Sequence, residues 1–358
     1  MSDRIYLDHA ATTSMLPAAR TAMGEAMERW ANPSSLHAEG RAARAELEAA
    51  RGRVAAAYGW GHELIFTSGA SESLAIALDR SMAERRLITA VEHDSVLRHS
   101  EGAETLRVDA DGLIDLDSLA SALAQPGRAL VAIQWANSET GVRQPVAAIA
   151  EAVHAAGAIL LVDAAQMPAK ADSDVMRHAD LVAVSAHKRA GPPGIGALLV
   201  RDFATLRPTG GQEKGYRPGT ENLPGAIGYA VAVEAAEDIR YMATLRARLD
   251  TALTAAGGEV VAATSPRTPA IGGYRMPGVS AAAQLIRFDL GGFAVSAGSA
   301  CSSGSMRPSH VLLAMGWSEP ALREVVRVSF GRATGEAEVD AFAAAWRAIF
   351  AEARARAA

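Results

Sequence analysis

The chain has 358 residues, of which 49% are hydrophobic and 21% charged, so it is long enough for one large or two ordinary globular domains. Its formal net charge of -5 at pH 7, with the positive charges scattered along the sequence, argues against nucleic-acid binding. No apolar run reaches the roughly 18 to 20 residues of a membrane span, and the N-terminal residues lack the basic and apolar regions of a signal peptide, so we expect a cytoplasmic protein.

Short apolar runs rich in Val, Ile and Leu alternate with alanine-rich segments of helical length. The runs that we expect to form strands span residues 63–68, 86–92, 129–136, 158–164, 180–186 and 195–201. Continuous apolar strands between helices are typical of a mostly parallel sheet that is covered on both faces, so we predict the α/β class. Ligands of such sheets bind beyond the carboxyl ends of the strands, and the polar residues that end these runs are therefore the candidate site.

The pattern changes after about residue 230. A long helix rich in Ala, Glu and Arg is expected over residues 229–257, followed by scattered strands and terminal helices. This change predicts a second, smaller domain.

Two polar residues at strand ends form an informative pair. Asp163 follows the apolar run AILLV, and Lys188 follows DLVAVSAH. Taken singly, Asp163 could cap the next helix and Lys188 could be a solvated loop lysine. Together they are what pyridoxal 5′-phosphate requires, because a lysine amine forms its Schiff base and a carboxylate keeps its ring nitrogen protonated.

A phosphate group needs hydrogen-bond donors, and the stretch FTSGASES (66–73) leads from a strand into a helix N-terminus. An ordinary helix start capped by Ser68 or Ser71 would have a similar sequence. Ser185 and His187 could add donors from the lysine loop. His93 ends another apolar run, where it could stack on a flat ring and carry protons or simply be solvated.

The only cysteine, Cys301, lies in the stretch SAGSACSSG (296–304). One cysteine cannot form an intrachain disulfide or a multi-thiolate metal site, and we predict no metal. An inert buried thiol would have apolar neighbours, whereas Cys301 has serines and glycines. This composition favours a reactive thiol on a mobile arm, with Gly298 and Gly304 supplying backbone freedom.

Eleven blocks of the sequence, which run almost from end to end, resemble the cysteine desulfurases of the class V aminotransferase family. They are YLDHAATT (6–13), NPSSLHAEGRAAR (32–44), IFTSGASES (65–73), EHDSVL (92–97), ANSETG (136–141), VDAAQ (162–166), SAHKRAGPPGIGALLVR (185–201), GGQEKGYRPGTEN (210–222), SAGSACSSG (296–304), PSHVLLAMG (308–316) and VRVSFGRAT (326–334). The form of the cysteine loop resembles the NifS/IscS-like group rather than the SufS-like group, which has an Arg-x-Gly-His-His-Cys pattern there.

The resemblance implies the aspartate-aminotransferase-like fold (fold type I), with a large, mostly parallel seven-stranded sheet domain and a smaller α+β domain. We expect residues 15–238 in the large domain, and residues 1–14 and 239–358 in the small domain that carries the cysteine loop. The resemblance also implies a homodimer, L-cysteine as substrate and a sulfur-acceptor protein as partner. That partner would be an iron–sulfur scaffold or a sulfurtransferase, with iron–sulfur cluster assembly as the default pathway.

The resemblance assigns roles by position. The implied catalytic residues are the Schiff-base lysine Lys188, the acid/base His93, and Cys301, which would take the substrate sulfur as a persulfide and leave L-alanine. The implied cofactor-binding residues are Ala70, Ser71, His93, Asn137, Asp163, Gln166, Ser185, His187, Lys188 and, from the other subunit, Thr220. Asn137 and Arg327 would meet the substrate carboxylate; without the resemblance, a surface ion pair would be the ordinary interpretation of Arg327.

This sequence departs from the family pattern at several places. Ser138 stands where a second asparagine is frequent, Pro218 where serine is usual, and Ser71 where threonine is common. The terminal tail after the last helix is shorter than in IscS proteins, so we expect either that a scaffold partner binds differently or that the partner is a different one.

Two alternatives remain open to the sequence. One is a selenocysteine lyase or another pyridoxal-phosphate lyase or aminotransferase, and a second is a non-catalytic scaffold with the same fold. A nicotinamide dehydrogenase is disfavoured because no G-x-G-x-x-G follows the first strand.

Overall fold

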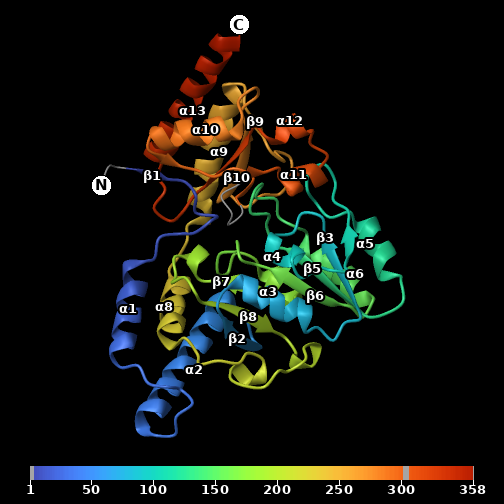
Figure 1. The fold of residues 1–358 in the computed structure, drawn as a ribbon, viewed down its shortest axis with the longest axis vertical. Coiled ribbons are helices and arrows are strands. Elements are labelled where there is room, and N and C mark those ends of the chain that lie inside the picture. The colour runs from blue at the N-terminus through green and yellow to red at the C-terminus, as the bar shows by residue number, and fades with distance from the viewer. Residues whose placement is uncertain (1–3, 301–305, 358) are drawn as a thin grey trace.

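Seven strands form the main sheet of the computed structural model, which describes residues 4–300 and 306–357 (Figure 1). Their spatial order is β2 (Glu63–Thr67), β8 (Gly196–Val200), β7 (Leu181–Ser185), β6 (Ile159–Asp163), β5 (Ala129–Gln134), β3 (Arg85–Thr89) and β4 (Glu104–Leu106). The pairs from β7 through β6, β5 and β3 to β4 are parallel, whereas β8 is antiparallel to both β7 and β2. The predicted α/β class and the mostly parallel seven-stranded sheet are confirmed.

Every strand of this sheet except the edge strand β4 buries side chains on both faces, as continuous apolar runs predict. Leu160 and Val162 of β6 belong to a core cluster on one face, and Ile159 and Leu161 to a cluster on the other. The helices that contribute to the first cluster are α1 (Pro17–Glu28), through Ala26, and α2 (Ala38–Tyr58), α5 (Leu116–Leu123), α6 (Val146–Ala155), α7 (Ser173–His178) and α8 (Leu223–Glu234). Those of the second are α3 (Ala70–Asp79) and α4 (Asp94–Leu97).

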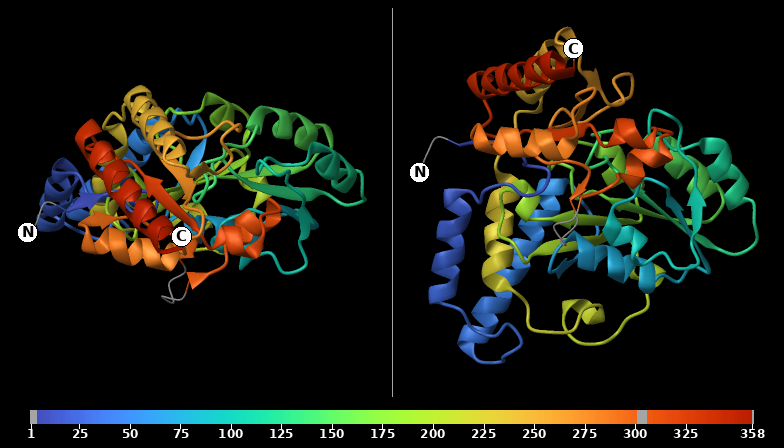
Figure 2. Two further views of the ribbon diagram at one scale, coloured as in Figure 1. Left: turned by 90° about the horizontal axis from the view of Figure 1, so that it is seen from above. Right: turned by 45° about the horizontal axis from the view of Figure 1, so that its top comes forward.

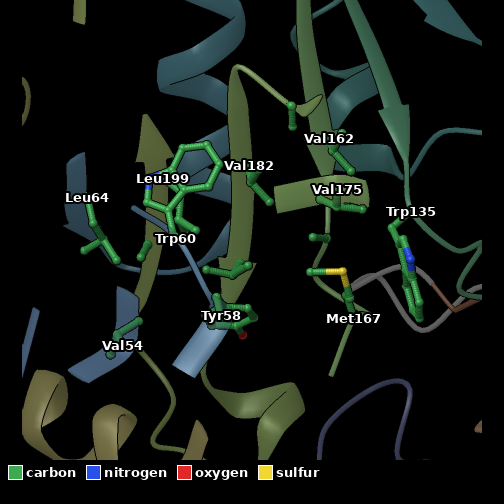
Figure 3. Packing of buried hydrophobic residues seen from close by; sticks show 14 of the residues in the cluster. Val54, Tyr58, Trp60, Leu64, Trp135, Val162, Met167, Val175, Val182 and Leu199 are labelled. Carbon is green, nitrogen blue, oxygen red and sulfur yellow. The ribbon is translucent and has the colours of Figure 1, made fainter. Parts of the chain in front are cut away.

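Part of the first cluster is drawn in Figure 3. Val54 and Tyr58 of α2 face strand residues such as Leu199 and Val182, and all four are buried. The helix α1 (Pro17–Glu28) packs outside this layer, against α8 (Figure 1). This close packing fixes the main sheet as a rigid base for the strand ends.

A smaller α+β layer lies beyond the carboxyl ends of the main strands. Its three-stranded antiparallel sheet has the order β14 (Val325–Ser329), β10 (Ile271–Arg275) and β9 (Glu259–Val260). The helices α9 (Ile239–Ala255), α10 (Ala281–Leu290) and α13 (Glu336–Ala357) cover it, with α9 and α13 side by side (Figure 2). Near the N-terminus, β1 (Ile5–Tyr6) pairs with β11 (Phe293–Ala294). The predicted domain boundaries themselves stay a prediction.

The long helix expected over residues 229–257 is wrong. The structure divides it into α8 and α9, with a break at residues 235–238 where Ala235 has extended backbone angles. Asp238 then caps α9 by accepting a hydrogen bond from the Tyr241 amide at 2.9 Å. Alanine-rich composition favours a helix throughout, but the aspartate cap favours a new start, and tertiary contacts decide between them.

A small apolar cluster joins the two layers. It brings together Val91, which follows β3, with Val311 and Leu312 of α11 (His310–Ala314). Met315 and Leu322, the latter from α12 (Glu319–Leu322), extend this junction cluster.

In the described part of the chain, no helix is both long and apolar enough to cross a membrane.

Candidate active site

A pocket of about 590 Å³ opens at the carboxyl ends of the main strands. This volume lies within the roughly 300–1,000 Å³ of small-molecule sites. Predicted site residues that line it are Ala70, Ser71, His93, Asn137, Asp163, Gln166, Ser185, His187, Lys188 and Arg327. The fold therefore brings together side chains that are separated by more than two hundred residues in the sequence.

Lys188 lies in η1 (His187–Arg189), a single turn between β7 and β8. The Thr13 amide donates to the His187 carbonyl and the Leu16 amide to the Ala190 carbonyl, both at 2.9 Å, so the N-terminal segment holds the lysine turn on both sides. Burial lowers the pKa of Lys188 to about 8, with Arg327 and Arg189 acting in the same direction and Asp163 opposing them. About a tenth of the amine is thus neutral, and nucleophilic, at pH 7, far more than for a lysine of ordinary pKa.

Asp163 is the last residue of β6 and is buried. Its Oδ1 accepts a hydrogen bond from the Ala165 amide at 2.9 Å. The alternative of a helix cap is wrong, because the next helix, α7, begins ten residues later with Asp172 as its cap. The carboxylate at this position raises the pKa of Lys188, which otherwise falls through burial.

The helix α3 begins at the pocket without a side-chain cap on its first amides. Ser71 is not a cap, since its hydroxyl bonds that of Ser95 at 2.7 Å. At the start of β8, a Cβ on Gly196 would lie 2.6 Å from the Cα of Gly69, so only glycine lets the helix start approach the sheet this closely. The free amides and the positive end of the helix dipole make this a suitable place for an anion.

Two side chains of the lysine loop add to this anion site. The Ser185 hydroxyl is buried and has no hydrogen-bond partner among the described residues, although such groups are normally satisfied. The His187 Nδ1 lies 3.1 Å from the Thr12 hydroxyl, and burial, followed by the charges of Lys188 and Arg189, lowers the pKa of His187 to about 4. An orphaned hydroxyl, a helix start and a nearby amine together fit a cofactor that carries a phosphate and an aldehyde.

His93 caps α4 through its Nδ1, which accepts from the Ser95 amide at 3.1 Å. This bond assigns the proton of the neutral ring to Nε2. Although the side chain faces the open pocket, surrounding protein atoms desolvate it and lower the pKa of His93, as does the Lys188 charge, while Asp163 opposes both. The ring is therefore mainly neutral at pH 7.

Both predicted amide side chains hold the pocket wall. Gln166 Nε2 donates to the Ala10 carbonyl at 3.0 Å. Asn137 Oδ1 accepts from the amides of Glu139 and Thr140, each at 2.9 Å, and its Nδ2 donates to the Val91 carbonyl at 3.1 Å. These bonds give Asn137 a structural task, and its contact with cofactor or substrate stays a prediction.

Arg327 of β14 is buried in the pocket and is not a surface residue. Its Nη2 lies 2.6 Å from Asp8 Oδ1, and its Nη1 donates to the Ser138 carbonyl at 3.0 Å. The ordinary interpretation of Arg327, a surface ion pair, is therefore wrong about location: the arginine does pair with an aspartate, but inside the pocket. Its Nε has no hydrogen-bond partner among the described residues, so the guanidinium has one unsatisfied N–H donor.

The roles of two further predicted residues stay predictions. Cys301 lies outside the described residues, but Ser296 and Gly298 before it and His310 after it line the pocket. On either side of the segment that contains it, β12 (Ser299–Ala300) pairs with β13 (Met306–Arg307). Thr220 is exposed in this single chain and does not line the pocket described here; its predicted role, from the other subunit, stays a prediction.

Comparison with known proteins places this pocket in a family. The family model "Aminotransferase class-V" matches residues 5–342. A curated relative named "Cysteine desulfurase" from Gluconacetobacter diazotrophicus is 38% identical over 94% of this chain and 90% of its own length. The chain belongs to the class V aminotransferases, in their cysteine desulfurase group.

Further matches agree with this membership. An "IscS-like cysteine desulfurase" from Mycobacterium tuberculosis is 36% identical over 94% of this chain and 93% of its own length. The solved structure of a NifS-like protein from Rickettsia africae superposes with a TM-score of 0.89 at 29% identity, over 97% of this chain and 99% of that chain. A structure described as "SspA in complex with cysteine" has a TM-score of 0.78 at 30% identity, over 92% and 99% of the two chains.

Several pocket residues of this family member were not singled out in the sequence. Asp8 lies within the block YLDHAATT, but nothing in the sequence indicates its partner Arg327. His310, which starts α11, places its Nε2 2.9 Å from the Glu92 carbonyl oxygen, and the Ser309 hydroxyl donates to Glu139 at 2.6 Å. These bonds fasten α11 to the loops that carry His93 and Asn137.

Glu92 ends the apolar run 86–92 and so belongs to the candidate polar residues, but the sequence assigned it no role, and it is fully buried. Its Oε1 accepts from the Thr89 hydroxyl at 2.6 Å and the Gln134 amide at 3.0 Å, while its Oε2 has no described partner. Burial raises the pKa of Glu92 to about 8, and the Asp163 charge adds to this effect. Glu92 is thus mainly a neutral acid at pH 7.

Replacing Glu92 by Gln should stabilise the protein above pH 5. The folded state holds a proton that the unfolded state releases near pH 4.5, so the wild type loses stability as the pH rises toward about 8. Glutamine carries no such penalty. Thermal unfolding at pH 5 and pH 8 should show an advantage of the variant that grows with pH, and an advantage independent of pH would contradict a neutral Glu92.

Proposed function

We propose that this protein is a cysteine desulfurase that uses pyridoxal 5′-phosphate to move sulfur from L-cysteine to Cys301. One observation carries the proposal: the Lys188 amine, the Asp163 carboxylate and the orphaned Ser185 hydroxyl meet in a single pocket. The chain around this pocket is related over most of its length to curated cysteine desulfurases.

The residues that would hold the cofactor fall into three groups. The start of α3 with Ala70 and Ser71, together with Ser185 and His187, would bind the phosphate. Asp163 would pair with the ring nitrogen, Gln166 would donate to the ring hydroxyl, and His93 would stack on the ring. Lys188 would tether the aldehyde carbon. When bound, this cofactor supplies an electron sink for the bond that breaks at the substrate α-carbon.

Lys188 and His93 are the proton carriers of the proposed reaction. A Lys188 amine with a pKa lowered to about 8 is partly neutral at pH 7 and can accept the α-proton at its Nζ. His93 carries a proton on Nε2 in its neutral form and can pass it on. Arg327, with Asn137 behind the same wall, would bind the substrate carboxylate and orient it.

Cys301 is the proposed sulfur carrier. Its thiolate attacks the substrate sulfur, the bond between sulfur and the substrate β-carbon breaks, and that carbon keeps the electron pair and takes a proton. The products are L-alanine and a persulfide on Cys301, so one L-cysteine and one enzyme thiol account for every atom.

The proposal includes partners. Thr220 would reach the phosphate of the neighbouring subunit in a homodimer, which agrees with its exposure in the single chain. The persulfide would pass to an acceptor protein, an iron–sulfur scaffold or a sulfurtransferase, with cluster assembly as the default. We keep the boundaries 15–238 for the large domain, and 1–14 with 239–358 for the small one.

Mass spectrometry tests the proposal directly. After incubation of the holoenzyme with L-cysteine, the peptide that contains Cys301 should gain the mass of one sulfur atom, and L-alanine should appear in solution. The adduct should disappear on treatment with a thiol reductant. A Cys301→Ala variant should retain the cofactor's visible absorbance and lose sulfur transfer.

Other outcomes separate the alternatives. Sulfur release that survives Cys301→Ala would indicate a lyase that does not use the thiol. A preference for selenocysteine over cysteine would indicate a selenocysteine lyase. Failure to take up pyridoxal 5′-phosphate at all would leave only a scaffold of the same fold.

A further inference from the structure

A buried cluster of charged side chains lies directly behind the lysine turn. It consists of Arg189, which follows Lys188, Glu237 in the break between α8 and α9, and Arg332 after β14. Arg189 Nη1 donates to Glu237 Oε2 at 3.2 Å, and Arg332 Nη2 donates to Glu237 Oε1 at 3.0 Å. The side chains of the three residues are between 8% and 17% exposed. We call them the Arg–Glu–Arg cluster.

The cluster also holds backbone. Arg332 Nη1 donates to the carbonyl of Arg189 at 3.1 Å, the first carbonyl after that of Lys188. The same guanidinium donates to the carbonyls of Ala232, Ala235 and Ala236 at 3.3 Å each, at the end of α8. Three segments that are distant in sequence are therefore tied together at the residue next to the lysine.

The charges in the cluster do not balance, because two guanidinium groups share one carboxylate. Other charged groups face Lys188: Asp163 from β6 and Arg327 from β14, while His93 and His187 are mainly neutral at pH 7. Tyr58 and Tyr229, which pair at 3.1 Å and lie near Arg189, are also neutral, since burial raises the pKa of both. His9 and Glu338 also lie beside the cluster; burial lowers the pKa of His9, and Glu338 accepts from the Gly335 amide at 2.9 Å. Among the described residues, Glu237 is the only carboxylate that pairs with either arginine, so it is the counterion that limits the positive charge behind the lysine.

We propose that Glu237 is a positioning residue for Lys188: it holds Arg189 and Arg332 on the carbonyl side of the lysine and offsets the positive charge that they place there. The inference rests on the proposed function of Lys188. The break between α8 and α9, which the alanine-rich sequence does not predict, would thus serve to place the Glu237 carboxylate beside the lysine turn.

The direction in which the pKa of Lys188 changes distinguishes an electrostatic role of Glu237 from a purely structural one. Arg189 lowers the pKa of Lys188, and the negative charge of its partner Glu237 should offset part of that effect. Removing the Glu237 charge should lower the pKa of Lys188 further, and removing Arg189 should raise it. If the cluster only supported the fold, both variants would loosen the turn, admit water and raise the value toward that of an ordinary lysine.

Competitive labelling with acetic anhydride can measure this, because the chain has only three lysines, Lys170, Lys188 and Lys214. Lys170 and Lys214 are exposed and serve as internal references. In the full chain freed of cofactor, Glu237→Gln should shift the pH midpoint of Lys188 labelling down by roughly half a unit, and Arg189→Met should shift it up by roughly one unit. In the holoenzyme, the pH midpoint of the visible absorbance change should move in the same directions.

The matched control is Glu234→Gln. Glu234 ends α8 three residues before Glu237, but it pairs with Arg53 at the surface, and its loss should leave the midpoint unchanged. The inference would be overturned if Glu237→Gln and Arg189→Met shifted the pH midpoint of Lys188 labelling in the same direction, or if Arg189→Met did not shift it. Because this labelling needs neither cysteine nor turnover, failure of desulfurase activity would refute the proposed function separately.

Discussion

Lys188→Ala should lower cysteine turnover by about 10⁴-fold or more, the upper range for loss of an essential acid/base that also acts as a nucleophile. Lys188 is the only lysine among the described residues that line the pocket, so no other side chain there offers an amine of lowered pKa. Alanine formation under saturating L-cysteine, followed with wild type and variant at equal cofactor occupancy, measures the loss.

The control for this variant is Lys214→Ala. Lys214 is exposed and pairs with Glu63 at the surface, far along the chain from the lysine turn, and its loss should leave turnover within about twofold, as for most surface substitutions. Turnover by Lys188→Ala at even a tenth of the wild-type rate would show that another group takes the α-proton, and would remove the central residue of the proposal.

Asp163→Asn should reduce the rate of persulfide formation by about 10²- to 10³-fold, the range for removing one preorganised electrostatic contact. Asparagine can still accept the Ala165 amide hydrogen bond through its Oδ1, so the turn should persist. Under the proposed function, the variant would lack the negative charge that keeps the ring nitrogen of the cofactor protonated. It also no longer raises the pKa of Lys188, which should fall below its wild-type value of about 8.

Single-turnover mass spectrometry of the Cys301 peptide would give this rate without interference from product release. Asp174→Asn is a suitable comparison, because Asp174 is a half-exposed residue at the start of α7 that pairs with Arg177. A persulfide rate in Asp163→Asn equal to that of Asp174→Asn would argue that Asp163 serves only the β6 turn.

The strands were predictable because burial on both faces leaves a strong apolar signal. All six expected runs begin within one residue of an observed strand, namely β2, β3, β5, β6, β7 and β8. The edge strand β4 was missed because its residues Glu104, Thr105 and Leu106 are few and only one of them is buried. The α8–α9 break was missed because its position depends on contacts with Arg189 and Arg332.

The site was predictable one residue at a time, but its pairings were not. Lys188 and Asp163 could be singled out because each lies at or just after the end of an apolar strand. The partner of Arg327 is Asp8, more than three hundred residues away, and sequence spacing carries no record of such a contact. Likewise, Asn137 looks like a ligand-binding amide until its hydrogen bonds to Glu139, Thr140 and Val91 are seen.

The junction cluster couples the loop of His93 mechanically to the helix that follows the cysteine segment. Val91 precedes the Glu92–His93 pair, and Val311 and Leu312 follow soon after the cysteine segment; all three share one apolar seam. Because close-packed interiors transmit displacement rather than absorb it, any displacement of α11 would carry the loop of His93 with it. Under the proposed function, an acceptor protein that bound against α11 would therefore also shift the proposed proton carrier.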